Sequence, residues 1–122
     1  QKFMKVLTIE QMNKLKGLGV DVKPKGMCLM YTSDSSDNYY LKYGESTCED
    51  DVAAFGLQEV VDMLPYTFNN NYLRIYRSIS MYYFIYENMS SENDIIEKGR
   101  TSLQAAYNML IWVIVTGYLK IK

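Results

Sequence analysis

Residues 101–119 read TSLQAAYNMLIWVIVTGYL, and they carry the strongest structural signal in the chain. Thr101 and Gln104 fit a capping box, in which each side chain bonds the backbone N–H of the other residue. This pattern predicts a helix that runs to Thr116, with Gly117 just past its end. The helix is apolar nearly all round, which is typical of a helix buried on more than one side. We therefore expect it to lie across a sheet and to be covered by another helix or by a partner chain.

Shorter patterns outside this helix predict two further helices and several strands. Thr8 and Gln11 form a capping box that predicts a helix over 9–17. Apolar residues at helical spacing predict another helix over 57–64. Strands are predicted at 27–32, 39–43, 52–55, 66–68, 72–77 and 79–86, with two β-hairpins among them. A single long strand is the alternative to the second hairpin, and the asparagines at 69–71 predict a turn, because asparagine tolerates left-handed backbone angles. The expected fold class is α+β: a mostly antiparallel sheet of two β-hairpins packed against the long C-terminal helix, with two short helices.

Alternation within the predicted strands assigns side chains to faces and completes a predicted core. If Leu73 and Ile75 face the core, then Tyr72, Arg74 and Tyr76 share the opposite face, because side chains alternate along a strand. The residues that we expect in the core are Leu29, Leu41, Val60, Leu64, Leu73, Ile75, Leu103, Ala106, Leu110, Trp112 and Ile114.

Length and composition exclude several classes of function. The 122 residues suit one domain spanning 1–122. The chain has no histidine, which excludes Ser-His-Asp, Cys-His and histidine–metal chemistry. Its net charge of −1 lacks the basic excess that is typical of nucleic-acid binding. The longest apolar run, 109–115, is too short to cross a membrane. We expect no cofactor.

The first residues and the cysteines bear on where the protein works. The segment MKVLTIEQM from Met4 reads as a natural cytoplasmic start, so residues 1–3 are expected to be upstream sequence or added residues. A mature secreted N-terminus is the alternative, because a removed signal peptide leaves no trace. In the cytoplasm Cys28 and Cys48 are expected to be free, whereas secretion would allow a bridge between them.

Two polar segments carry the carboxylate and hydroxyl groups that a site of chemistry would need. Asp34, Ser36, Asn38 and Glu45 stand at the first, third, fifth and twelfth positions of a calcium-loop pattern, whose oxygen ligands suit calcium. Tyr39 replaces the glycine that such a loop needs for its turn, so a polar hairpin loop is the favoured interpretation and no metal is expected.

The second polar segment is the acidic run from Glu45 to Asp51. Paired carboxylates do acid–base work only where burial separates their pKa values. Consecutive acidic residues on a loop are usually solvated, so we expect no catalysis there.

Tyrosine and arginine side chains form the candidate interaction surface. Ser80, Tyr82, Phe84 and Tyr86 share one face of their strand by the same alternation. Tyrosine, tryptophan and arginine are enriched at protein interfaces, and aromatic rings also stack on bases in single-strand binders. A sheet face packed under a helix is the purely structural alternative. The candidate residues are Tyr72, Arg74, Tyr76, Tyr82 and Trp112.

Three segments carry a family resemblance: AFGLQEVVDMLP at 54–65, YLRIY at 72–76, and SLQAAYNMLIWVIVTGYLK at 102–120. Together they resemble a group of short proteins, without assigned function, from prophages and mobile elements of gut anaerobic bacteria. The resemblance covers most of the chain from about Ala54 and rests on core positions. It implies an intracellular accessory protein and brings no catalytic residues. The hairpin over 27–43 lies outside it.

The sequence therefore predicts a small, non-enzymatic protein-interaction module of a phage or mobile element, working in the cytoplasm. A protein partner or self-association, for example as a homodimer, is expected. Nucleic acid is a less favoured partner, and a membrane is not expected. The alternative function is a single-stranded nucleic-acid binder that uses Tyr72, Arg74, Tyr76 and Tyr82.

Overall fold

A computed structural model describes residues 5–33, 38–89 and 94–119. The described residues form three helices and seven strands, so the fold class is α+β, as predicted. They fall into two compact units, the first ending at Gly56 and the second beginning at Leu57. The helices of the described residues are too short or too polar to cross a membrane.

Helix α1 (Ile9–Gly17) opens the first unit and confirms its capping box. The Thr8 hydroxyl accepts from the Gln11 backbone N–H at 3.1 Å, and the Gln11 side chain accepts from the Thr8 backbone N–H at 2.9 Å. Met12 and Leu15 are fully buried on one side of the helix, as their spacing predicts.

The first sheet follows, with strands β1 (Cys28–Ser33), β2 (Tyr39–Gly44) and β3 (Val52–Ala53) in the order β2-β1-β3. Both strand pairs are antiparallel, and Tyr31 of the central strand lies opposite Leu41 on one side and Val52 on the other. The Tyr31 hydroxyl donates to the Leu7 carbonyl at 2.6 Å, which ties the segment before α1 to this sheet.

The second unit contains helix α2 (Leu57–Met63), strands β4 (Thr67–Phe68), β5 (Asn71–Arg77), β6 (Tyr82–Asn88) and β7 (Ile95–Gly99), and helix α3 (Ser102–Val115). The four strands form the second sheet, antiparallel throughout and in chain order. Asn69 and Asn70 have positive φ angles of 49° and 66°, which confirms the predicted turn between β4 and β5.

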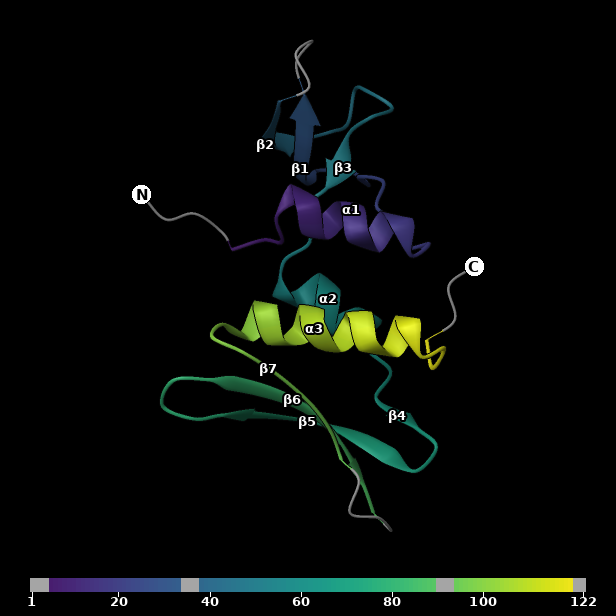
Figure 1. The fold of residues 1–122 in the computed structure, drawn as a ribbon. Helices are drawn as coiled ribbons and strands as arrows, with labels where there is room; N and C mark the ends of the chain where they lie inside the picture. The colour runs from purple at the N-terminus through teal and green to yellow at the C-terminus, as the bar shows by residue number, and fades with distance from the viewer. Residues whose placement is uncertain (1–4, 34–37, 90–93, 120–122) are drawn as a thin grey trace. The chain divides into compact units, whose positions relative to one another are not determined.

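Helix α3 begins at the predicted N-cap residue, ends as predicted and is covered on two sides. The Thr101 hydroxyl accepts from the Gln104 backbone N–H at 3.0 Å, and Gly117 has a φ of 85° just past the end. The helix packs on β6 and β7 on one side and on α2 on the other, as Figure 1 shows. The second helical cover explains its wide apolar surface. Its buried residues are Leu103, Ala105, Ala106, Met109, Leu110 and Val113.

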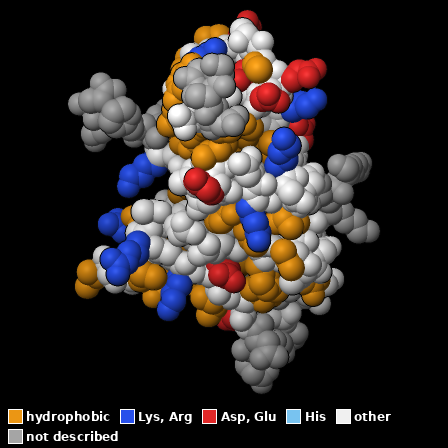
Figure 2. Space-filling model, turned by 45° about the horizontal axis from the view of Figure 1, so that its top comes forward, with side chains coloured by type: hydrophobic (Ala, Val, Ile, Leu, Met, Phe, Trp, Pro, Cys, Tyr) orange, Lys and Arg blue, Asp and Glu red, His pale blue; other side chains and the backbone are white. Residues whose placement is uncertain are grey.

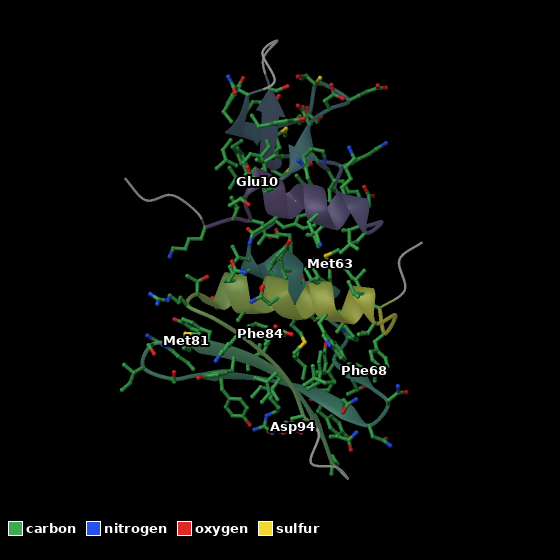
Figure 3. The ribbon with its side chains drawn as sticks, viewed as in Figure 1. Glu10, Met63, Phe68, Met81, Phe84 and Asp94 are labelled. Atoms are coloured by element: carbon green, nitrogen blue, oxygen red, sulfur yellow. The ribbon has the colours of Figure 1, made fainter. Side chains whose placement is uncertain are left out.

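Four aromatic rings gather at the C-terminal end of α3. Phe68 stacks on Tyr118 with centroids 4.3 Å apart and meets the edge of Tyr86 at 4.6 Å. Trp112 stacks on Tyr118 at 5.5 Å. Figure 3 shows Phe68 beneath this end of the helix. Such pairs add stability beyond the area that they bury, so this cluster fastens β4 and the segment after α3 to the sheet.

Three details differ from the sequence-based expectations. The two hairpins belong to separate sheets rather than to one. Strand β7 was not predicted, because its segment has only two adjacent isoleucines before charged residues. Leu41 and Ile75 were predicted in the core but are 42% and 52% exposed. Leu41 lies on an edge strand, and Ile75 lies on β5, whereas α3 packs on β6 and β7.

Candidate functional site

The second sheet has one face that no described element of its own unit covers, and we call it the outer face. Leu73 lies opposite Tyr86, and Ile75 lies opposite the buried Phe84, so these residues share the face toward α3. Their strand neighbours point the other way. The outer face comprises Tyr72, Arg74, Tyr76, Tyr83, Ile85, Glu87, Ile96 and Lys98.

Arg74 is held in a defined position on this face. Its Nη1 lies 3.2 Å from Glu87 Oε1, and its guanidinium carbon lies 5.4 Å from the centre of the Tyr76 ring. The Tyr76 hydroxyl donates to Glu87 Oε2 at 3.2 Å. Because the Arg74 and Glu87 side chains are 54% and 37% exposed, the ion pair adds little stability. Its effect is to orient the Arg74 and Tyr76 side chains on the outer face.

A hollow of about 430 Å³ opens beside Arg74. Tyr66, Tyr72 and Met89 supply apolar walls, while Glu87 and Asp94 supply carboxylates. Asp94 Oδ1 accepts from the Asn88 backbone N–H at 3.3 Å, which connects the start of β7 to β6. A hollow of this size and mixed lining can receive a side chain of a bound protein.

The outer face confirms that Tyr72, Arg74 and Tyr76 share a surface, and it excludes Tyr82 and Trp112 from that surface. Tyr82 lies opposite Arg77, on the face toward α3. Trp112 belongs to the aromatic cluster at the end of α3, on the same side as Tyr86. The tyrosine on β6 that does join the outer face is Tyr83, opposite Tyr76.

Burial raises the pKa of two ionisable side chains on the face toward α3. It raises the pKa of Tyr86, whose hydroxyl donates to the Pro65 carbonyl at 2.6 Å and so acts as a structural link. Burial also raises the pKa of the Glu97 carboxyl, which lies opposite Phe84. A raised carboxyl pKa is a feature of some catalytic acids. Glu97 does not line the hollow beside Arg74.

The acidic segment of the first unit is organised around Asp51. Its Oδ2 accepts from the Ser46 hydroxyl at 2.9 Å and from the backbone N–H groups of Thr47 and Cys48, each at 3.3 Å. Burial alone would raise the Asp51 pKa, but these bonds and the Thr32 hydroxyl outweigh it and lower the pKa. Asp51 therefore holds the loop as a charged acceptor. Figure 2 shows acidic side chains gathered on this unit.

We predict that Asp51→Ala lowers the free energy of unfolding by about 2 kcal/mol at neutral pH, because several donors lose a charged acceptor. Since the folded pKa is lowered, this contribution is complete above the ordinary value of about 3.9 and is lost as pH falls through the folded pKa. Urea unfolding as a function of pH measures it. The exposed neighbour Asp50→Ala is the control and should change stability little. A deficit of Asp51→Ala that stays constant in acid would contradict this role.

The calcium-loop pattern does not form a site. Asp34 and Ser36 lie outside the described residues. Asn38 and Glu45 stand at opposite ends of β2, and an extended strand of this length separates them by roughly 20 Å. They are therefore too far apart to bind one ion.

The described parts of the chain contain neither a candidate metal site nor a disulfide bond. There, no cluster of three or more acidic, cysteine or histidine side chains could hold a metal ion. Cys28 is half-buried and Cys48 is exposed, and both are free thiols.

Comparison with known proteins finds no matching family model, no matching curated protein and no matching solved structure. The geometry of the outer face is therefore the basis for a proposal about function.

Proposed function

We propose that this chain is a non-enzymatic protein-interaction module whose contact surface is the outer face of the second sheet. The observation that carries the proposal is the position of Arg74, between the Tyr76 ring and the Glu87 carboxylate on an uncovered face. Arginine and tyrosine dominate the binding energy of many protein interfaces. Side chains that are already positioned lose less entropy when a partner binds.

The composition of the outer face supports a protein partner over a nucleic acid. Ile96 is 53% exposed beside the tyrosines, and apolar contact area of this kind suits a protein. The exposed Tyr72 and Tyr76 rings would also suit stacking on bases. However, the Glu87 carboxylate offsets the charge of Arg74 and would lie against a phosphate. Single-stranded nucleic-acid binding is therefore the alternative function. Its surface would not include Tyr82, which lies on the face toward α3.

The setting that we propose is the cytoplasm of a bacterium that carries a phage or mobile element, where the chain is an accessory protein. The resemblance at 54–65, 72–76 and 102–120 supports this setting. The neighbouring genes test it directly, since phage or conjugation genes on both sides would support it and ordinary housekeeping genes on both sides would not.

Two arginines of one strand provide a matched test of the proposed surface. Arg74 and Arg77 each lie 5.4 Å from a tyrosine ring, but Arg77 is on the opposite face with Tyr82. Tagged wild-type protein, Arg74→Ala and Arg77→Ala would be used to capture partners from the source cells, with quantitative mass spectrometry. We predict that Arg74→Ala reduces recovery of a specific protein by about tenfold or more, as for an interface hot spot, and that Arg77→Ala does not.

Equal recovery with both variants would contradict the proposed surface. Titration of mixed-sequence oligonucleotides at low and high salt tests the alternative. A single-strand binder would bind at low salt, lose affinity steeply as salt rises and weaken in Arg74→Ala.

A further inference from the structure

Strand β2, at the edge of the first sheet, has an unpaired backbone edge and one face of apolar side chains. β2 is at one end of the order β2-β1-β3, so its outer edge pairs with none of the described strands. Tyr39, Leu41 and Tyr43 share one face of β2 and are 39%, 42% and 64% exposed. Figure 2 shows hydrophobic side chains on the surface of this unit. A long, apolar, open edge favours pairing with another strand.

The hydrogen-bond pattern shows which backbone groups β2 offers. The Ala54 backbone N–H donates to the Leu29 carbonyl, so Leu29 and Tyr31 direct their backbone groups toward β3. In an antiparallel ladder, bonding alternates between the two sides of a strand. Met30 and Thr32 therefore bond to their partners on β2, Lys42 and Tyr40. The intervening β2 residues, Tyr39, Leu41 and Tyr43, direct their N–H and C=O groups outward.

We propose that a second copy of this chain pairs with β2, antiparallel, about a twofold axis at Leu41. This register places Leu41 opposite Leu41 of the other copy and Tyr39 opposite Tyr43. All the outward backbone groups of these residues then find partners, and the three apolar side chains of each copy meet on one face. Lys42 lies opposite Tyr40, which is a favourable pairing of a cation with an aromatic ring.

Charge selects this register from the others that the backbone permits. A twofold axis at Lys42 would set two lysines directly opposite each other, and like charges in that position are destabilising. An axis at Tyr43 would place the Glu45 carboxylate against Leu41. An axis at Tyr40 would pair fewer of the apolar residues. The axis at Leu41 alone joins every outward-facing residue of β2 without opposing like charges.

The edge of the second sheet along β5 is less suited to a second copy. Strand β4 already pairs with Asn71 and Tyr72 at the start of β5, and the Leu73 N–H donates to the Tyr66 carbonyl. By the same alternation, only Ile75 and Arg77 of β5 direct their remaining N–H groups outward. An arginine at the open end of an edge strand opposes pairing between like copies. The proposed dimer contact thus lies on the first unit and is independent of the outer face of the second sheet.

The test is the oligomeric state of the whole chain by sedimentation equilibrium over a wide concentration range. A contact limited to one strand pair is small, so a weak dimer with a Kd of about micromolar or above is expected. Leu41→Pro removes an outward N–H that the fold does not use, and proline is tolerated there on an edge strand. It should weaken the dimer by about tenfold or more through the loss of the two central hydrogen bonds.

Charged substitutions at Leu41, which lies on the proposed twofold axis, provide a more specific test of the register. Leu41→Lys and Leu41→Glu should each be monomeric, because each sets like charges opposite each other, and an equimolar mixture should regain a dimer. Ile79→Lys, at a fully exposed site in the second unit, is the matched control and should keep the wild-type dimer. Circular dichroism would check that each variant is folded.

Three results would overturn the proposal. They are a folded wild-type chain that stays monomeric at millimolar concentration, a dimer unaffected by Leu41→Pro, and a mixture of the lysine and glutamate variants that stays monomeric. Partner capture tests Arg74, whereas the dimer measurements test Leu41. The two proposals can therefore fail independently of each other.

Discussion

Phe84→Ala is expected to lower the free energy of unfolding by about 4 kcal/mol, because it removes a large side chain from the contact between β6 and α3. Phe84 is only 1% exposed, and Figure 3 shows it between the sheet and the helix. Its loss leaves a cavity under α3 that the surrounding side chains fill only in part. Urea unfolding, followed by circular dichroism, measures the change.

Ile85→Ala provides the control for this substitution. Ile85 follows Phe84 directly but lies on the outer face, opposite Arg74, and is only half-buried. We expect its truncation to cost much less. Equal losses from the two truncations would contradict the assignment of the two faces of β6.

Gly99→Ala is expected to destabilise the protein by about 3 kcal/mol, at the upper end of the usual cost of overpacking. A Cβ at this position would lie 2.7 Å from the Ala105 backbone nitrogen and 3.0 Å from Gln104 Cβ and Cγ. The backbone of α3 cannot yield as a side-chain tip can, so the first turn of the helix must move away from β7. Thermal unfolding measures the cost.

Gly17→Ala is the matched control. An added Cβ at Gly17 meets no atom within 4 Å, and Gly17 ends helix α1, where alanine is the better helix former. It should leave stability unchanged or raise it by a few tenths of a kcal/mol. If Gly99→Ala is as mild as Gly17→Ala, then α3 does not approach β7 as closely as described.

Local signals explain how much of the fold was predictable. The caps at Thr8 and Thr101 and the asparagines of the β4–β5 turn act within a few residues, so the sequence predicts them and the structure confirms them. The pairing of the hairpins into two sheets depends on contacts between distant segments. No local pattern carries that information, so the sequence led us to expect one sheet where the structure has two.

Register explains why the predicted surface was only partly correct. Tyr72, Arg74 and Tyr76 were grouped correctly because alternation within one strand is a local property. Whether Tyr82 or Tyr83 joins them depends on the connection at 78–81, since a connection one residue longer or shorter would exchange the faces of β6. Tyr82 and Tyr83 are adjacent, so each face of β6 carries a tyrosine and the sequence favours neither register. Ile96 and Lys98 were missed with β7, whose adjacent isoleucines were the only signal.

Site-specific photocrosslinking tests most directly whether the outer face of the second sheet binds a protein. A photoreactive phenylalanine analogue would replace either Tyr76, on the outer face, or Tyr82, on the face toward α3, in the source cells. We expect protein adducts of defined mass from position 76 that Arg74→Ala abolishes, and no such adducts from position 82. Equal adducts from both positions, or adducts from position 76 that nuclease removes, would contradict protein binding by this face.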